Sequence, residues 1–143
     1  MTLGIFDHEF VTCQLDESVP VLLHRWKQAP PPEEFMFTLK RILEEYKTHK
    51  HQYPKLAWMV DAALLGELDE QVENWLVNDW EKMLFEQAGV RVHAVILGQD
   101  IFADYPIEKF KQDAERKFEK FNVHLGVFSN RDEAYHWMKK FVI

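Results

Sequence analysis

The chain of 143 residues fits a single domain, because its length is close to the common size for one hydrophobic core. Hydrophobic residues make up 47% and aromatic residues 14% of it, a composition that excludes an intrinsically disordered chain. The 24 acidic residues outnumber the 17 Lys and Arg residues and give a net charge of −7, which argues against general nucleic-acid binding and against docking on anionic lipid.

The cysteine content and the lengths of the apolar stretches indicate the cellular compartment to expect. Cys13 is the only cysteine, so the chain forms no internal disulfide and does not have a disulfide-stapled secreted fold. The first ten residues, MTLGIFDHEF, lack the basic segment and apolar core of a signal peptide, and no apolar stretch approaches the roughly 18 residues of a membrane span. We therefore expect a soluble cytoplasmic protein with one domain over residues 1–143 and no membrane association.

The N-terminal segment is typical of strands. Residues 5–16 are rich in Phe, Val, Ile and Thr without a helical period, and a turn near residues 7–9 makes them a hairpin. Residues 19–26 predict a third strand, which ends before the proline run of residues 30–32 because proline cannot pair in a central strand. The last of these prolines suits the first turn of a helix.

A helix is predicted after the prolines, because apolar residues recur at helical spacing and Glu33 and Glu34 oppose the positive end of its dipole. Its apolar stripe consists of Phe35, Leu39, Ile42, Leu43 and Tyr46. Residues 56–60 then form a short continuous apolar run, which predicts a strand covered on both faces.

A second helix is predicted over residues 69–88, with Asp69 as its N-cap and Gly89 in the left-handed conformation that ends it. Its buried stripe is predicted to contain Val72, Trp75, Leu76, Trp80, Met83 and Leu84. Because Trp75 and Trp80 are five residues apart, their side chains are not expected to share one line along the helix.

The C-terminal half continues the alternation, with a strand over residues 90–97, a helix over 107–121 and a strand over 123–128. Ser129, with Asp132 three residues on, makes a capping-box-like start to a final helix that packs through Ala134, Trp137, Met138 and Phe141. The order β-β-β-α-β-α-β-α-β-α predicts an α/β fold with a mixed, largely parallel central sheet of five to six strands, about four helices and an N-terminal antiparallel hairpin.

The pattern of VLLHRW, a Pro-Glu-Glu helix, LAWMVDAALLGELDEQVENW, AGVRVHAVILGQDIF and GVFSNRDEAYHWM resembles the STAS-like proteins, small bacterial relatives of the anti-sigma-factor antagonists. The resemblance covers the chain from about Val19 onward. It implies a STAS-like domain that acts as a regulatory module by docking a protein partner. In that family, phosphorylation of a Ser or Thr after an Asp at a helix start switches the docking.

Asp61 and Asp69 match the two aspartates of that family motif, with a loop of similar length between them. Glu70, Gln71 and Val72 stand where the family has its hydroxyl residue, and no hydroxyl residue lies between Asp61 and Trp80. The family's phosphorylation switch is therefore absent from this chain. Glu70 is either a fixed phosphomimic or an acidic support for the positive helix end, and we favour the second interpretation.

Two candidate sites follow from this organisation. Ligands of open α/β sheets bind at the carboxyl ends of the strands, which here supply Asp61, Gly98, Gln99, Asp100 and Ser129. A partner-contact surface is predicted at the second helix, with Asp69, Glu70, Gln71, Glu73 and Trp80 as its candidate residues. The outer strand of the hairpin needs a cover for its free backbone groups, so a symmetric homodimer is a further hypothesis.

Catalysis and metal binding find less support. His24, His93 and His124 lie on three predicted strands and would suit zinc if their rings shared a face, but their spacing is no zinc motif and structural histidines are favoured. Cys13 has no sequence neighbour that lowers its thiol pKa, and the chain has no phosphate-binding loop or nucleophile elbow. We therefore predict no cofactor and a non-catalytic module acting through protein–protein contacts. The alternative is a small-ligand domain for a nucleotide or lipid, and an enzyme is least favoured.

Overall fold

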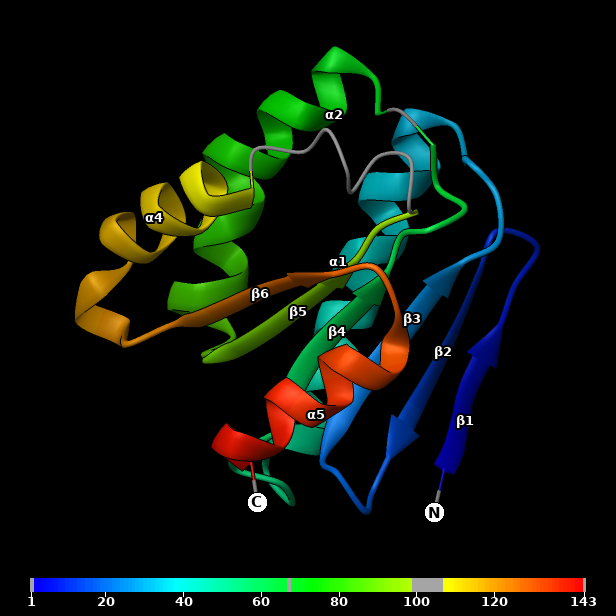
Figure 1. The fold of residues 1–143 in the computed structure, drawn as a ribbon. Coiled ribbons are helices and arrows are strands. Elements are labelled where there is room, and N and C mark those ends of the chain that lie inside the picture. Colours follow the sequence, from blue (N-terminus) through cyan, green and yellow to red (C-terminus); the bar gives the residue numbers. More distant parts are fainter. Residues whose placement is uncertain (1, 67, 99–106, 143) are drawn as a thin grey trace.

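Six strands form one mixed sheet, and they lie in sequence order across it (Figure 1). The structure is a computed structural model that describes residues 2–66, 68–98 and 107–142. The first three strands pair antiparallel and the last three continue parallel to the third. The strands are β1 (Thr2–Asp7), β2 (Val11–Asp16), β3 (Val21–Trp26), β4 (Ala57–Asp61), β5 (Val92–Ile96) and β6 (His124–Phe128). The predicted α/β fold with its N-terminal hairpin is confirmed.

Within the described residues, four helical regions accompany the sheet. They are α1 (Pro32–Lys50), a continuous second region made of α2 (Glu70–Trp75), η1 (Leu76–Trp80) and η2 (Met83–Gln87), then α4 (Ile107–Lys117) with the short η3 (Glu119–Phe121), and α5 (Arg131–Val142). Among the described residues, no helix combines the length and the apolar character needed to cross a membrane.

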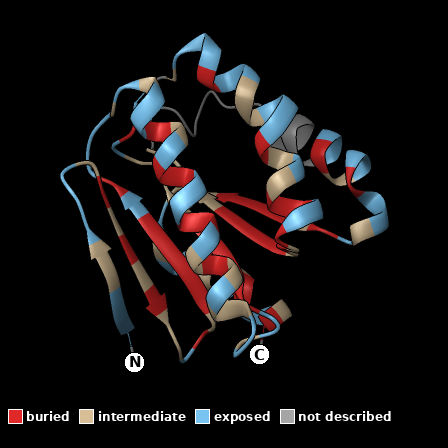
Figure 2. Cartoon of the chain, turned by 180° about the vertical axis from the view of Figure 1, so that it is seen from behind, coloured by how far each residue is buried: buried red, intermediate tan, exposed pale blue. Residues whose placement is uncertain are grey.

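The helices divide unequally between the two faces of the sheet (Figures 1 and 2). The helices that connect parallel strands, α1, α2 and α4, pack on one face, and α5 packs on the other. This division follows from the strand order, because right-handed crossovers between strands that neighbour one another in sequence place every connection on the same face. The helix α5 follows the last strand, so it is free to cover the opposite face.

The larger core lies between the sheet and the crossover helices (Figure 2). The register sets Leu22 beside Trp58 and Trp58 beside His93, so these side chains of three neighbouring strands share this face. The stripe predicted for α1 is confirmed, because its five apolar residues are all buried here. Burying a side chain of this size contributes about 1.5–3 kcal/mol, so the stripe fixes α1 on the sheet.

The smaller core lies beneath α5, whose Ala134 and Met138 are fully buried. A Cβ atom on Gly126 would lie 2.6 Å from Cε2 of Phe128 and 3.2 Å from Cε2 of Trp137. The two rings, with centroids 5.4 Å apart, therefore occupy the space that a side chain at position 126 would need. Glycine at this position allows the aromatic pair to close over β6.

Helix ends follow the predicted chemistry with one exception. Asp69 caps α2, since its Oδ1 accepts the N–H of Gln71 at 2.8 Å, and Gly89 has the left-handed φ of 75°. The predicted start of α5 at Ser129 is wrong, because Asn130 Oδ1 accepts the N–H of Glu133 at 2.9 Å. The helix begins one residue later than predicted, where asparagine caps as well as serine does.

The second helical region is not a regular α-helix, because η1 and η2 are π-helical. The N–H of Glu81 bonds the carbonyl of Leu76, five residues back. Trp75 and Trp80 consequently do share one line, and their rings stack with centroids 5.4 Å apart. The prediction that they would not was wrong because it assumed the α-helical repeat of 3.6 residues per turn.

Candidate functional site

Asp61 ends β4 as part of an ion pair and not as a free carboxylate. Its side chain is 13% exposed, and its Oδ2 lies 3.3 Å from Nη2 of Arg131 at the start of α5. Its Oδ1 accepts the N–H of Ala63 at 3.2 Å. Asp61 therefore points to the α5 face and ties the first turn of α5 to the sheet.

The other predicted ligand residues are only partly brought together. Gly98 approaches the loop after β4 closely, since a Cβ there would lie 3.2 Å from the carbonyl oxygen of Ala63. Ser129 is half-buried just beyond β6. Gln99 and Asp100 lie outside the described residues. Neither of the two hollows described below is lined by Asp61, Gly98 or Ser129.

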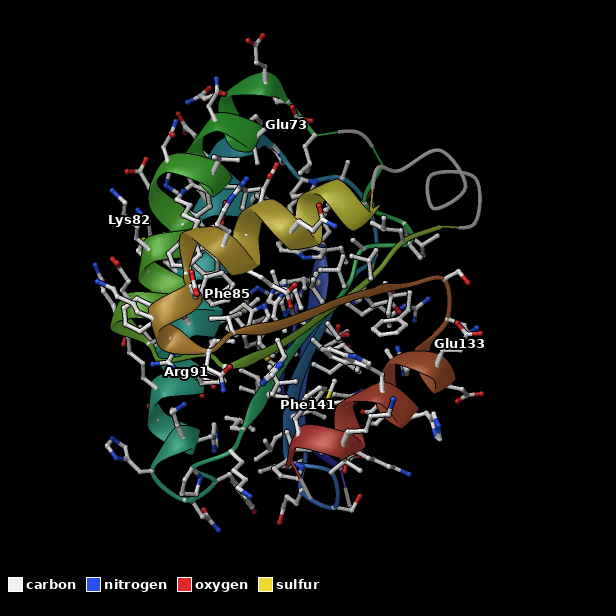
Figure 3. All side chains as sticks on the ribbon, turned by 60° about the vertical axis from the view of Figure 1, so that its left-hand side comes forward. Glu73, Lys82, Phe85, Arg91, Glu133 and Phe141 are labelled. Atoms are coloured by element: carbon white, nitrogen blue, oxygen red, sulfur yellow. The ribbon has the colours of Figure 1, made fainter. Side chains whose placement is uncertain are left out.

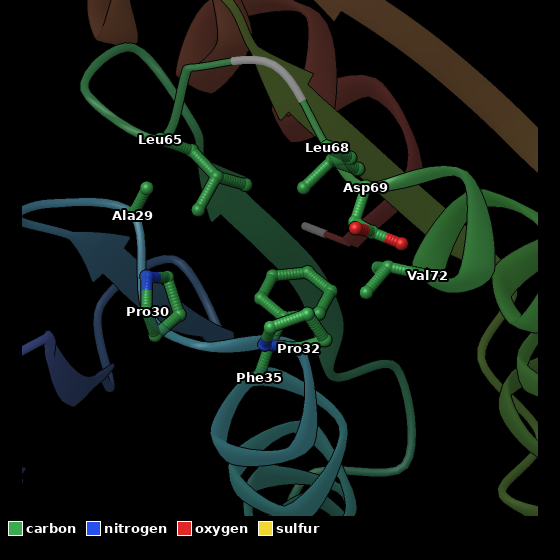
Figure 4. A pocket seen from close by; sticks show the side chains of 8 residues that line it. All are labelled: Ala29, Pro30, Pro32, Phe35, Leu65, Leu68, Asp69 and Val72. Atoms are coloured by element: carbon green, nitrogen blue, oxygen red, sulfur yellow. The ribbon is translucent and has the colours of Figure 1, made fainter.

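A cavity of about 160 Å³ opens between the first turns of α1 and α2 (Figure 4). Seven of its eight lining side chains are apolar, and the eighth is the carboxylate of Asp69. The lining residues are Ala29, Pro30, Pro32, Phe35, Leu65, Leu68, Asp69 and Val72. It is thus an apolar hole with one acidic group at its edge.

The parallel pairing of β3 and β4 builds this cavity, because the segments that follow two parallel neighbours emerge at the same edge of the sheet. The proline run after β3 forms one wall, and the loop after β4 forms the other through Leu65 and Leu68 (Figure 4). Phe35 lines the cavity and packs on the buried Trp26, with ring centroids 4.8 Å apart. The contact with Trp26 therefore joins the Phe35 wall of the cavity to the hydrophobic core.

Exposed carboxylates occupy the first turns of the two helices whose starts line the cavity. Glu33 and Glu34 occupy the first turn of α1, and Glu70 and Glu73 that of α2, where Figure 3 shows Glu73 pointing away from the body of the protein. No Lys, Arg or His occurs in residues 28–39 or in residues 56–81. We call these four glutamates and Asp69 the acidic rim.

The predicted partner-contact residues divide into two groups. Asp69, Glu70, Gln71 and Glu73 are all exposed at the start of α2. Trp80 is only 5% exposed and packs on Trp58 with ring centroids 5.8 Å apart, so it belongs to the core and offers no contact surface. The π-helical register turns it inward.

Sequence reasoning missed the apolar lining of the cavity. The sequence pattern predicts the prolines as a break between elements and the start of a helix, and Phe35 as part of a core stripe. The signal that pointed to a cavity is the loop ALLGEL after β4, which carries more leucine than a solvated connection needs. The leucines of this loop indicate a cavity only once it is known which segment the loop faces. The pairing of β3 with β4 shows that it faces the proline run.

The three strand histidines do not converge. His24 and His93 are buried on the crossover-helix face, on the strands either side of β4. His124 lies on the other face and stacks on Phe141, with centroids 4.3 Å apart. Among the side chains that the structure describes, no group of three or more His, Cys, Asp or Glu could hold a metal ion.

Burial is the main cause of the pKa shifts of the interior His and Cys side chains. Burial lowers the pKa of His24 to about 3, with a smaller effect from His93, and lowers the pKa of His93 itself to about 4. Among the described residues, neither ring nitrogen of His24 has a hydrogen-bond partner. Burial likewise raises the pKa of the Cys13 thiol to about 12, so this thiol stays protonated at neutral pH and is no nucleophile there.

A second, more open hollow of about 330 Å³ lies at the amino ends of β5 and β6. It is lined by Arg91, Val92, Phe121, Asn122, His124 and Phe141. Arg91 is engaged by the protein itself, because its Nη1 donates to the carbonyls of Phe85 and Val90 at 3.0 and 3.1 Å. The guanidinium of Arg91 therefore satisfies one backbone carbonyl of η2 and one of the segment that follows it.

Comparison of the chain with protein-family models, with curated proteins and with solved structures finds no match.

Proposed function

We propose that this chain is a STAS-like, non-catalytic binding module that docks a protein partner at the first turns of α1 and α2. The observation that carries the proposal is the apolar cavity of about 160 Å³ inside the acidic rim. Protein contacts commonly place one apolar anchor in a pocket and surround it with a polar rim. The arrangement here has both parts.

The size of the cavity favours a side chain of a partner over a nucleotide or a lipid. Pockets for small-molecule ligands typically enclose about 300–1,000 Å³. The present cavity, at about 160 Å³, is close to a well-studied engineered cavity of about 150 Å³ that binds benzene. A single leucine, methionine or phenylalanine side chain fits that space.

Exposed apolar side chains occur beside the cavity and on the solvent side of α1. Leu64 is 54% exposed and adjoins Leu65 of the lining, and Phe37 is 70% exposed on the crest of α1. Phe37 is also one turn from Glu33 and Glu34 on the same helix. An exposed leucine beside the cavity and an exposed phenylalanine on the adjoining helix support a contact surface in this region.

The docking we propose is constitutive. Glu70 is exposed beside the cap, and Asp69 alone makes the capping hydrogen bond to Gln71. A glutamate at this point keeps one negative charge at all times, whereas a phosphorylated hydroxyl carries about two only when modified.

Affinity capture from the cell of origin tests this function, with Ala29→Arg as the cavity variant. Ala29 is exposed, so the arginine obstructs the cavity mouth without disturbing the core. Gln112→Arg, on the exposed side of α4, adds the same charge elsewhere. We expect mass spectrometry to find a partner with the wild type and the Gln112→Arg control that is lost with Ala29→Arg, and purified partner to behave likewise. A partner retained by all three proteins would contradict the proposal.

A further inference from the structure

We infer that the segment docked at this site is basic, with one apolar side chain that enters the cavity and Lys or Arg residues on either side of it. This inference rests on the proposed function and adds the chemistry of the partner. It follows from the charges of the acidic rim and from the apolar lining taken together.

The acidic rim is unneutralised within the described part of the chain. None of Glu33, Glu34, Asp69, Glu70 and Glu73 takes part in an ion pair there. Lys40 lies further along α1, with its Nζ 6.0 Å from the ring centroid of Trp75. Two other cations, which follow β3 and β6, have partners elsewhere. Lys27 binds Asp7 and the carbonyl of His8, and Arg131 binds Asp61.

Helix stability explains part of this arrangement but not all of it. Acidic residues in a first turn oppose the helix dipole, and each contributes about 0.3–1 kcal/mol. That role requires no relation between the two helices. Here the two acidic turns also supply lining residues of one apolar cavity, so carboxylates of both α1 and α2 lie near a segment that docks there.

Such a site selects its partner by charge. A basic segment is attracted to the rim and associates faster, whereas an acidic segment, an anionic lipid surface or a nucleic acid is repelled. The apolar side chain of the partner is removed from water when it enters the cavity. The carboxylates of the acidic rim remain partly in water. The rim contribution should therefore weaken as the salt concentration rises.

Peptide display tests the inference without knowledge of the natural partner. A library of random linear peptides is selected on the wild type and counter-selected on Ala29→Arg. We expect the enriched peptides to share a large apolar residue flanked by Lys or Arg. Cavity-dependent peptides without basic residues would overturn this inference and leave the proposed function standing. A selection that yields no cavity-dependent peptide would overturn both, and so would a dimer that Ala29→Arg dissociates, because the occupant would then be a second copy of the chain.

A matched pair of charge variants then measures the rim. The rim variant is E33Q/E34Q/E70Q/E73Q, which keeps Asp69 and therefore the cap of α2. The control E44Q/E86Q/E119Q/E133Q removes the same charge from exposed positions elsewhere. For the leading selected peptide we expect binding about 10-fold to 100-fold weaker and less salt-dependent in the rim variant, and nearly unchanged binding in the control. Equal loss in both variants would show that only net charge matters and would overturn the inference.

Discussion

The indole rings of Trp75 and Trp80 stack with centroids 5.4 Å apart and an angle of 28° between their planes. The π-helical turn between them makes this possible, because it aligns residues five apart. Lys117 of α4 donates from Nζ to the carbonyl of Val77 at 3.0 Å, so a neighbouring helix binds the backbone of the π-helical turn. The half-buried Trp75 is thereby joined to the core through Trp80 and Trp58.

A double-mutant cycle on the two tryptophans tests this stack. Trp80→Ala should lower the free energy of unfolding by about 3–5 kcal/mol, because Trp80 is buried. Trp75→Ala should cost less, since Trp75 keeps part of its surface in water. Chemical denaturation should give a coupling energy of about 0.5–1.5 kcal/mol between the two sites. Additive losses would mean that the rings do not interact.

Gly126→Ala should destabilise the protein by about 1–3 kcal/mol, because its methyl group would collide with the rings of Phe128 and Trp137. Gly4→Ala is the matched control, since a Cβ there meets nothing within 4 Å. That control should be neutral or slightly stabilising, because it restricts the unfolded chain. Thermal unfolding of both variants checks the pair, and equal melting temperatures would contradict the packing described.

Stability should fall as the pH is lowered, because His24 and His93 are buried as neutral rings. Burial lowers their pKa values to about 3 and about 4, below the ordinary value near 6.5 that they regain on unfolding. The unfolded chain therefore binds more protons, and stability is complete above about pH 7 and decreases below it. Between pH 7.5 and 5.5 the two residues together should cost about 3 kcal/mol.

His24→Phe should flatten this pH dependence by roughly half, since it removes one of the two buried titrating rings. His136→Gln, at an exposed position of α5, serves as the control and should leave the slope as it is in the wild type. Urea unfolding measured across the pH range gives both slopes. A His24→Phe slope equal to that of the wild type would show that the ring titrates normally.

Substitutions of Asp69 should separate its capping role from its charge. Asp69→Ala should lower the free energy of unfolding by about 1 kcal/mol, because the hydrogen bond to the N–H of Gln71 is lost. Asp69→Asn should cost much less, since the amide oxygen can accept the same hydrogen bond. Denaturant midpoints compare the two, and equal losses would mean that charge, not capping, is what Asp69 supplies.

Much of the fold could be predicted from local pattern. The α1 stripe from Phe35 to Tyr46 repeats at helical spacing, and the strand before Asp61 is a continuous apolar run. Both signals are carried by the segment itself and do not depend on what it packs against. The π-helical register could not be predicted in this way, because it depends on contacts that Trp80 and Val77 make with other elements.

The candidate site could be predicted only in part for a similar reason. The exposed acidic start of α2 is a local feature, and Asp69 was identified as its cap from the sequence. The cavity is not local, because Pro32 and Leu65 line it together only once β3 and β4 are parallel neighbours. Likewise, the pairing of Asp61 with Arg131 joins residues 70 positions apart.

Hydrogen–deuterium exchange of the chain, free and bound to its captured partner, tests the central claim most directly. We predict that binding slows exchange in residues 29–37 and 64–76, the two segments that surround the cavity. Protection confined to β1 or to the hollow near Arg91 and Phe121, with exchange around the cavity unchanged, would contradict it.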